Sequence, residues 1–599
     1  MKKLFTFLSV IFIFSAQGQY FQRFYNVTTT PSTANRDEIF NSGIHTTYNY
    51  DAPPDSTFLI SVGTSYRQRV AGTATTTHDR FRYVKTTRDG SSVPINLGYE
   101  FGNTTLKSYH SSGNSVAEIK NAAGNGGFFA VGAVSSNYAT GATLSGGSDA
   151  LIARFNSLGT VSLSLALNFP NGADTAWCVR RSNFISNTFL VCGHSVDTVT
   201  NNVSCFVARI NTAGAVIWAF TYNFDFTSTP LSAISTARQL CEDKTTGNIY
   251  VVGTHQDRFT ATPNVDGLIF ALNSGGGMIW SNTYHLSSDD EFKAVRLTYD
   301  RNLIVGGHTD FAPAGVAPMT NMLLLKVRAA SGAIMFQSIH RVALATGIQY
   351  DSKCFDVLER KFVNSTGATA YEYYMAGPAF IPSGNRQLMY RVKSTGVGIN
   401  SYLYNIMRID SLFALDIDST PSSRGIFMFS SLNFPGGNSS SHVLKTTYQG
   451  ATCIDDCVPN PPKTIPIQMI VKQIPPFLNN NYNIMSVTRK KYFYKTDLMC
   501  TQAALNCNNP RELPTVAPIT KKTGITVYPN PAKDEITINT QKGIGNPVSV
   551  QLRNTFGQQV WQGKINGTGK INMQKLAPGV YFVHTDDPEG GYVSKVVKQ

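Results

Sequence analysis

Long apolar runs, catalytic motifs and charged residues are all scarce in this chain. Beyond residue 18, no segment approaches 18 consecutive apolar residues, so we expect no transmembrane segment in the mature protein. No G-x-S-x-G, H-E-x-x-H or P-loop pattern is present, which removes the usual motif support for a serine hydrolase, a zinc protease or a nucleotide hydrolase. No tight basic cluster with interleaved aromatics precedes Arg489, Lys490 and Lys491, so nucleic acid is not an expected partner.

The composition indicates an extracellular β-protein. Only 15% of the residues are charged, while Thr, Ser, Asn and Gly are abundant, as in turn-rich all-β chains. The formal net charge of +14 suggests acidic partners, such as an anionic polysaccharide or a membrane surface. A dispersed charge that only keeps the protein soluble is the favoured alternative.

The N-terminus predicts export. Lys2 and Lys3 precede an apolar run over residues 4–14, which is too short to span a bilayer, and a small-x-small site follows at residues 16–18. We therefore predict a signal peptide over residues 1–18. The residue directly after the cleavage site is not a cysteine, which argues against a lipoprotein anchor.

The middle of the chain repeats itself. An apolar run that ends in a small residue recurs at intervals of roughly 50 to 70 residues, the range of repeat architectures. The runs end at Gly63, Gly132, Gly193, Gly253, Gly307, Gly377 and Ser430.

A second element follows, which reads as strand, turn and strand. It has Asn156, Asn211 or Asn273 before the turn and Gly159, Gly214, Gly276, Gly332 or Gly396 within it. Trp218, Trp280 and Phe336 fall at matching positions on the outgoing strand, where we expect them to pack between sheets.

Each repeat thus supplies about four strands, which is typical of a β-propeller blade. The repeats resemble those of secreted bacterial β-propeller surface proteins. We predict an all-β fold with a propeller over residues 19–450, in which seven landmarks favour seven blades over the alternatives of six or eight. Residues 20–25 are similar to the last strands of two blades, residues 217–224 and 279–286, so we expect the N-terminus to complete the final blade. The rival, a β-solenoid, needs repeats of about 20 to 25 residues, which are not found.

Residues 451–510 form a cysteine-bearing β stretch that closes the propeller or is appended to it, with strands expected at residues 465–474 and 482–494. A proline-rich linker follows over residues 511–524. In an exported protein, four cysteines here predict two disulfides in one of three pairings, with a zinc site as the rival. They are Cys453, Cys457, Cys500 and Cys507, whereas Cys178, Cys192, Cys205, Cys241 and Cys354 read as buried small hydrophobic residues.

The last segment, residues 525–599, alternates apolar and polar residues in short runs, which predicts a small Ig-like β-sandwich. Three motifs stand in it, namely Tyr528, Pro529, Asn530 and Pro531, then Leu576, Pro578, Gly579, Val580 and Tyr581, and finally Lys595, Val596, Val597 and Lys598. In this order they resemble the C-terminal sorting domain of Bacteroidetes type IX secretion cargo. The resemblance implies partners in the outer-membrane translocon and its sorting and attachment machinery, and a secreted or surface-attached product.

Candidate chemistry in the repeats is sparse. His194, His255 and His308 occupy equivalent places in consecutive repeats and are weak metal candidates, because neighbouring blades would hold them too far apart. The carboxylate candidates are Asp289, Asp290 and Glu291, Asp416 and Asp418, and Asp455 and Asp456. We expect no cofactor and favour non-catalytic binding or adhesion toward a glycan or a surface protein. The alternative is a glycan-active hydrolase or lyase that uses the funnel of the propeller.

Overall fold

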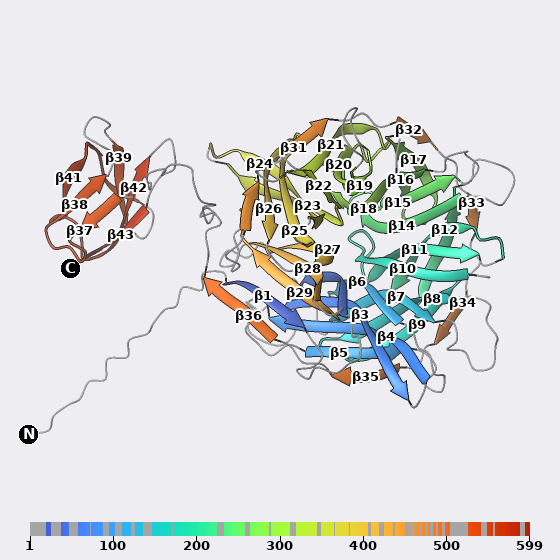
Figure 1. Ribbon diagram of the computed structural model, residues 1–599. Helices are drawn as coiled ribbons and strands as arrows, with labels where there is room; N and C mark the ends of the chain where they lie inside the picture. Colours follow the sequence, from blue (N-terminus) through green and yellow to red (C-terminus); the bar gives the residue numbers. More distant parts are fainter. Residues whose placement is uncertain are drawn as a thin grey trace, which may run out of the picture. The chain divides into compact units, whose positions relative to one another are not determined.

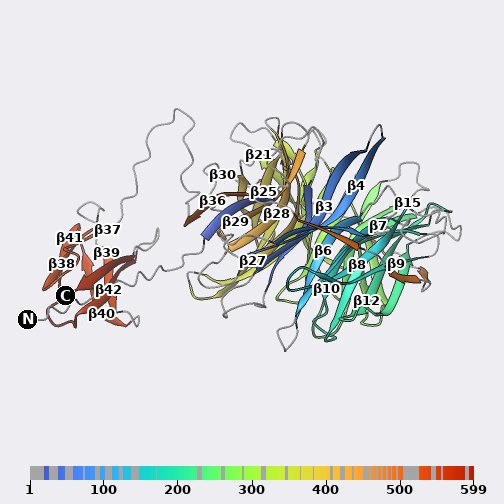
Figure 2. The same cartoon turned by 90° about the horizontal axis from the view of Figure 1, so that it is seen from below.

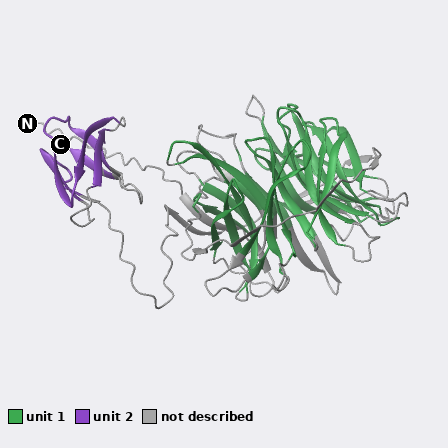
Figure 3. Cartoon of the chain, turned by 90° about the horizontal axis from the view of Figure 1, so that it is seen from above, with its two compact units in different colours: residues 1–511 green, residues 512–599 purple. Residues whose placement is uncertain are grey.

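The computed structural model divides the chain into two compact units, Met1–Arg511 and Glu512–Gln599 (Figure 3). Every regular element in the described residues is a β-strand, and none of them forms a helix able to cross a membrane. Only the backbone is described for residues 19–25 and 457–503. The described residues are 19–25, 38–46, 58–71, 74–87, 95–101, 111–120, 126–135, 147–169, 172–197, 199–224, 233–257, 264–286, 289–311, 319–343, 349–364, 366–381, 384–404, 409–418, 425–434, 438–449, 457–460, 463–466, 470–473, 477–479, 483–486, 489–493, 497–503, 525–540, 548–554, 558–586 and 593–599. The predicted signal peptide lies outside them.

Antiparallel pairing sorts the described strands of the first unit into seven four-stranded blades around an axis (Figure 1). Blades 1 and 2 are β2 (Glu38–His45), β3 (Phe58–Ala71), β4 (Ala74–Thr87) and β5 (Ile95–Phe101), then β6 (Ser111–Ile119), β7 (Gly127–Ser135), β8 (Ser148–Asn156) and β9 (Val161–Asn168). Blades 3 and 4 are β10 (Gly172–Arg181), β11 (Thr188–Asp197), β12 (Val203–Asn211) and β13 (Val216–Asn223), then β14 (Ala233–Glu242), β15 (Ile249–Asp257), β16 (Val265–Leu272) and β17 (Met278–His285).

The remaining blades follow the same plan, seen from a second direction in Figure 2. Blades 5 and 6 are β18 (Asp290–Leu297), β19 (Leu303–Thr309), β20 (Asn321–Val327) and β21 (Ile334–Ala343), then β23 (Asp356–Val363), β24 (Thr369–Phe380), β25 (Arg386–Lys393) and β26 (Gly398–Tyr404), with the short β22 (Gln349–Ser352) between them. Blade 7 is β27 (Ile409–Asp418), β28 (Gly425–Phe434), β29 (Asn438–Thr446) and β1 (Gln19–Tyr25).

The first described strand of the chain completes the last blade. Strand β1 pairs antiparallel with β29, with Gln22 opposite Leu444 and Tyr25 opposite Ser441. The closure predicted from the sequence of residues 20–25 is therefore confirmed. It ties the start of the chain to the final repeat and covers an edge that would otherwise be open.

The described strands between residues 457 and 503 form a belt around the propeller, instead of the two strands expected from the sequence. Seven short strands each pair antiparallel with the outermost strand of one blade, in the order of blades 6, 5, 4, 3, 2, 1 and 7. They lie along the rim in Figure 1. They are β30 (Cys457–Asn460), β31 (Lys463–Pro466), β32 (Ile470–Gln473), β33 (Phe477–Asn479), β34 (Asn483–Ser486), β35 (Arg489–Phe493) and β36 (Asp497–Ala503). The belt thus gives each blade a fifth strand.

The apolar cores lie between blades, because each blade buries both faces. Hydrophobic clusters join blades 1 and 2, 2 and 3, 3 and 4, 4 and 5, 5 and 6, and 6 and 7. A further cluster joins blade 1 to blade 7, in which Leu59 and Val84 meet Phe427 and Phe429. The burial of both faces explains near-continuous apolar strands such as β20, which is buried throughout. The predicted all-β propeller fold is confirmed.

The repeated turn glycines and aromatics contact one another across blades. Gly276 has a φ of +87°, and a Cβ there would lie 3.1 Å from Trp218 of the preceding blade. Trp280 is buried between blades 4 and 5, where its Nε1 donates to the carbonyl of Ala329 at 3.0 Å. Both features were predicted from the repeat pattern, and together they fix the spacing of neighbouring blades.

The second unit is a small sandwich of two sheets. One sheet has β37 (Ile525–Tyr528), β38 (Glu535–Thr540) and β41 (Thr568–Asn572). The other has β40 (Gln559–Ile565), β39 (Val548–Asn554), β42 (Gly579–Asp586) and β43 (Val593–Lys598). Their inner faces form one core that includes Ile536, Val550, Ile571 and Val583. The sandwich predicted for residues 525–599 is confirmed.

Candidate functional site

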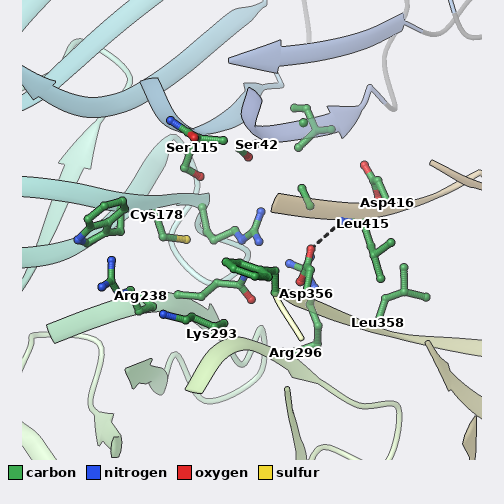
Figure 4. Close-up of a pocket in the computed structure, with 18 of the residues that line it drawn as sticks. Ser42, Ser115, Cys178, Arg238, Lys293, Arg296, Asp356, Leu358, Leu415 and Asp416 are labelled. Atoms are coloured by element: carbon green, nitrogen blue, oxygen red, sulfur yellow. Dashed lines mark hydrogen bonds and ion pairs between the residues drawn. The ribbon is translucent and has the colours of Figure 1, made fainter. Parts of the chain in front are cut away.

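A cavity of about 540 Å³ lies where the inner strands of all seven blades meet. Its volume falls within the roughly 300–1,000 Å³ typical of ligand pockets. Strands β2, β6, β10, β14, β18 and β27 contribute to its wall, and blade 6 contributes β23 and Phe355. This is the axial channel of the propeller (Figure 4).

A β-bulge in the inner strand supplies one cavity residue in each of blades 1 to 5. The pairing register skips one residue of each inner strand, which a bulge leaves unpaired and turns out of the sheet. The skipped residues are Asn41, Asn114, Trp177, Arg238 and Lys293, and all of them line the cavity.

In blades 1 to 5, the bulges explain the glycine that ends the repeated apolar run. The register break falls beside Gly63, Gly132, Gly193, Gly253 or Gly307 of the second strand. A Cβ on Gly253 would lie only 1.7 Å from the backbone oxygen of Thr236, and one on Gly193 would lie 1.9 Å from that of Thr175. Glycine is needed here because the bulged inner strand approaches the backbone of the second strand closely.

Polar side chains of the cavity tie neighbouring blades together. Asn114 Nδ2 donates to the carbonyl of Ala176 at 2.9 Å, and Gln239 Oε1 accepts from the backbone N–H of Val295 at 2.8 Å. Each bond runs from the inner strand of one blade to that of the next. The wall is therefore held in place by the ring itself, which suits a preformed site.

One wall of the cavity is basic. Arg238 of β14 stacks on Trp177, with its guanidinium carbon 4.4 Å from the ring centroid. The indole Nε1 of Trp177 donates to Nδ1 of His194 at 2.8 Å. Burial, followed by the charge of Arg238, lowers the pKa of His194 to about 4, so this imidazole is neutral and can accept that bond. Lys293 of β18 completes this wall and forms an ion pair with Glu291.

The carboxylates of the cavity come from blades 6 and 7. In Figure 4, Asp356 and Asp416 lie on the other side of the cavity from Arg238. Asp356 accepts from Arg296 Nη2 at 2.9 Å and from the backbone N–H of Leu415 at 2.9 Å. Glu359 also lines the cavity, and burial raises its pKa to about 7. The cavity is therefore polarised, with surplus cations on one wall and carboxylates on the other.

The three histidines lie at equivalent places on β11, β15 and β19, but each has contacts within its own blade. His194 accepts from Trp177, His255 Nδ1 lies 3.0 Å from Ser235 Oγ, and His308 Nε2 lies 3.8 Å from Glu291 Oε2. Burial lowers the pKa of His308 to about 3. Across the described part of the chain, no group of three or more His, Cys, Asp or Glu side chains is arranged to hold a metal ion.

Two of the other carboxylate candidates accept hydrogen bonds from backbone N–H groups. Asp289 Oδ1 accepts from the backbone N–H of Val265 at 2.9 Å, and Asp290 Oδ2 accepts from that of Leu286 at 2.8 Å. Asp416 lines the cavity, as described above. The side chain of Asp418 and the pair Asp455 and Asp456 lie outside what the structure describes.

The five cysteines of the repeats lie in apolar surroundings, as the sequence predicted. Cys178, Cys192, Cys205 and Cys354 are buried in the interblade cores, and Cys241 is partly buried against one of them. Cys457 and Cys500 belong to β30 and β36 at the two ends of the belt, where the backbone alone is described. Cys453 and Cys507 lie outside the described residues, so the disulfide pairing stays a prediction.

The three C-terminal motifs meet in the sandwich. Asn530 Oδ1 accepts from the backbone N–H of Val597 at 2.9 Å, and strand pairing sets Tyr581 opposite Val596. The hydroxyl of Tyr581 donates to the carbonyl of Ala577 at 2.7 Å, within the second motif. Tyr528 is 49% exposed, so the assembled motifs present part of their surface to solvent.

The bulge residues are the functional candidates that sequence reasoning missed. Arg238 and Lys293 stand at matching places in the repeats, upstream of Gly253 and Gly307. The signal in the sequence that could have revealed these cavity residues was a polar or aromatic residue in the first strand of each repeat. Unequal loop lengths before the glycine conceal this alignment in the sequence.

Comparison with known proteins identifies the C-terminal unit. Residues 526–599 match the family described as secretion system C-terminal sorting domain. No curated protein matches the chain. Among solved structures, Drosophila Semaphorin 2a is similar over 95% of this chain and 96% of its own, at 9% identity and a TM-score of 0.28, which is too low to carry an argument.

The C-terminal unit is therefore a secretion sorting domain, which supports export by type IX secretion. This domain directs export through the periplasm to the outer membrane or the cell surface, as the sequence predicted.

Proposed function

We propose that this protein is a secreted or surface-attached β-propeller that binds its ligand in the axial cavity without altering it chemically. The observation that carries the proposal is the construction of the cavity, to which every blade contributes and in which interblade hydrogen bonds hold the wall. Such a preformed polar pocket suits recognition of a glycan or a surface protein, and hence adhesion.

The state of Asp356 supports binding over hydrolysis. Glycoside hydrolysis needs two carboxyl groups that both face the scissile bond. Asp356 is engaged by Arg296 and by the backbone N–H groups of Val357 and Leu415. The oxygens of Asp356 therefore bond to groups in the wall of the cavity and not to a substrate.

A glycan-active hydrolase or lyase is the second candidate, because of Glu359. Burial raises the pKa of this cavity carboxyl to about 7, which suits a general acid at neutral pH. The backbone N–H of Tyr299 donates to it at 2.6 Å. A mechanism through Glu359 would still require a second carboxylate free to act as base or nucleophile.

A glycan array probed with the mature chain, residues 19–599, tests both candidates if each bound glycan is then weighed by mass spectrometry. Binding without a change in mass is the expected result. Cleavage that is lost in Glu359→Gln would replace binding with the enzymatic function. If an Asn114→Leu variant bound the same glycans with unchanged affinity, the binding site would lie outside the cavity.

A further inference from the structure

Positive charge is in excess on one wall of the axial cavity. Burial lowers the pKa of Lys293, and the neighbouring cations Arg238 and Lys353 lower it further. Glu291 offsets part of this charge, since Lys293 lowers its pKa to about 2 against the effect of burial. Arg238 and Lys293 both act on the single carboxylate of Glu291, which leaves a net positive region in a site of low dielectric.

The guanidinium of Arg238 is held in position, and the charge of Glu291, which pairs with Lys293, offsets its charge only in part. Its carbon lies 4.4 Å from the ring centroid of Trp177, and His194 fixes that indole from behind. Its Nε is buried without a hydrogen-bond partner in the described part of the chain. A buried polar group without a hydrogen-bond partner costs free energy, and such groups are rare in folded proteins, so this one calls for an explanation.

A second guanidinium in the cavity adds to the positive potential. The Nε of Arg180 is also buried without a partner among the described residues. Burial opposes the charge of Arg180, but Cys178, followed by Asp356 and Asp416, raises its pKa. Burial lowers the pKa of Arg238, and Glu291 and then Cys205 offset only part of this effect.

We propose that the cavity binds an oxyanion of its ligand, a carboxylate or a sulfate group, at Arg238 and Lys293. A guanidinium matches the two oxygens of such a group, and a charge-assisted bond would satisfy the Nε of Arg238, while Lys293 would add a second positive charge beside its partner Glu291. The opposite wall, with Asp356 and Asp416, would repel a second anion and orient the ligand. The proposal names the ligand chemistry of the binding function proposed above, and it rests on that function.

A small organic acid or an acidic polysaccharide can carry the oxyanion, and a titration distinguishes the two. The mature chain is titrated with inorganic sulfate, monomeric glucuronate and hexameric oligogalacturonate, with uncharged maltohexaose as the comparator. We expect the acidic probes to bind and maltohexaose to bind at least tenfold more weakly. Tighter binding of the hexamer than of the monomer would identify a polysaccharide end, and equal binding a small acid.

Arg238→Met is the decisive variant, because methionine keeps the apolar stem and removes the charge. We expect it to lose about tenfold or more in affinity for the acidic probes. It should not lower the melting temperature, since a buried cation whose charge is only partly offset is removed; a purely structural Arg238 would show the opposite. Arg328→Met is the matched control, because Arg328 is exposed in the turn between β20 and β21 and its loss should leave affinity unchanged.

Three results would overturn the proposal. They are the absence of binding to any acidic probe, equal affinity for maltohexaose, and unchanged affinity in Arg238→Met. Cavity-dependent binding of a neutral glycan on the array would leave the proposed function standing while this proposal fails. Arg238→Lys provides a further check, because it keeps the charge without the planar fork and should bind with intermediate affinity.

Discussion

Gly253→Ala tests whether the repeated glycine exists to accommodate the bulge. The Cβ of an alanine would lie 1.7 Å from the backbone oxygen of Thr236 and 2.8 Å from its carbonyl carbon. An ordinary contact of this kind is about 3.4 Å or more, so β14 and β15 would have to separate by well over an ångström. The obstacle is backbone on both sides, and no side-chain rotation can relieve it.

The expected cost is at the upper end of that for overpacking, about 3 kcal/mol or more. The strand that moves carries Arg238, so the affinity for an acidic probe should fall together with the stability. Chemical denaturation followed by tryptophan fluorescence, together with the titration described above, measures both.

Gly275→Ala is the matched control. Gly275 lies in the exposed turn between β16 and β17, and the nearest atom to an added Cβ is 3.4 Å away. We expect a change of less than about 1 kcal/mol there. If Gly253→Ala proved as stable as Gly275→Ala, the assignment of this glycine to the bulge would be refuted.

Four further predictions concern stability, pH, the belt and export. Glu242→Ala leaves Arg209 buried without the partner that it now contacts at 2.9 Å, so it should destabilise the propeller by about 3–5 kcal/mol in urea, whereas the exposed Lys120→Ala should cost less than about 1 kcal/mol. Burial raises the pKa of Asp174 from its usual 3.8 to about 7, so the stability that its protonation contributes is fully present below pH 3.8 and is lost as the pH rises to 7. Asp174→Asn should therefore remove roughly 2–3 kcal/mol of the pH dependence of stability between pH 5 and 8. If the melting temperatures at pH 5 and pH 8 differed as much in the variant as in the original protein, the assignment would be contradicted. Removal of the belt, residues 457–503, uncovers the outer edge of each blade and should cause aggregation on size-exclusion chromatography, so a monomeric variant would show that the belt is dispensable. Deletion of residues 523–599 should leave the protein in the periplasm on cell fractionation, and normal secretion without them would count against the sorting role.

Much of the architecture follows from local patterns. The period of the strand–glycine element predicts blades, because each blade is a local antiparallel meander whose turns need glycine at positive φ, as at Gly276. The similarity of residues 20–25 to other last strands predicts ring closure, which the pairing of β1 with β29 shows. The sorting tail was predicted from motifs that the sandwich brings together, such as Asn530 and Val597.

The belt was not predictable in the same way. Its strands contain three to seven residues and carry no repeat of their own. Each one exists because the outer edge of a blade offers backbone hydrogen bonds to any extended segment that passes it. Such pairing is decided by the partner edge and not by the sequence of the short strand.

The sequence by itself determined the export signal, the repeat and the closure of the ring, since these depend on local periodicity and on motifs contiguous in the chain. Only the tertiary structure decided which side chains share the axial cavity. Trp177, Arg238 and Lys293 lie in three different blades, and the bulges that turn them inward are set by backbone packing against glycines of the next strand. The charge of the site, and with it the kind of ligand that it can hold, arises from convergence on the axis, which no stretch of sequence contains.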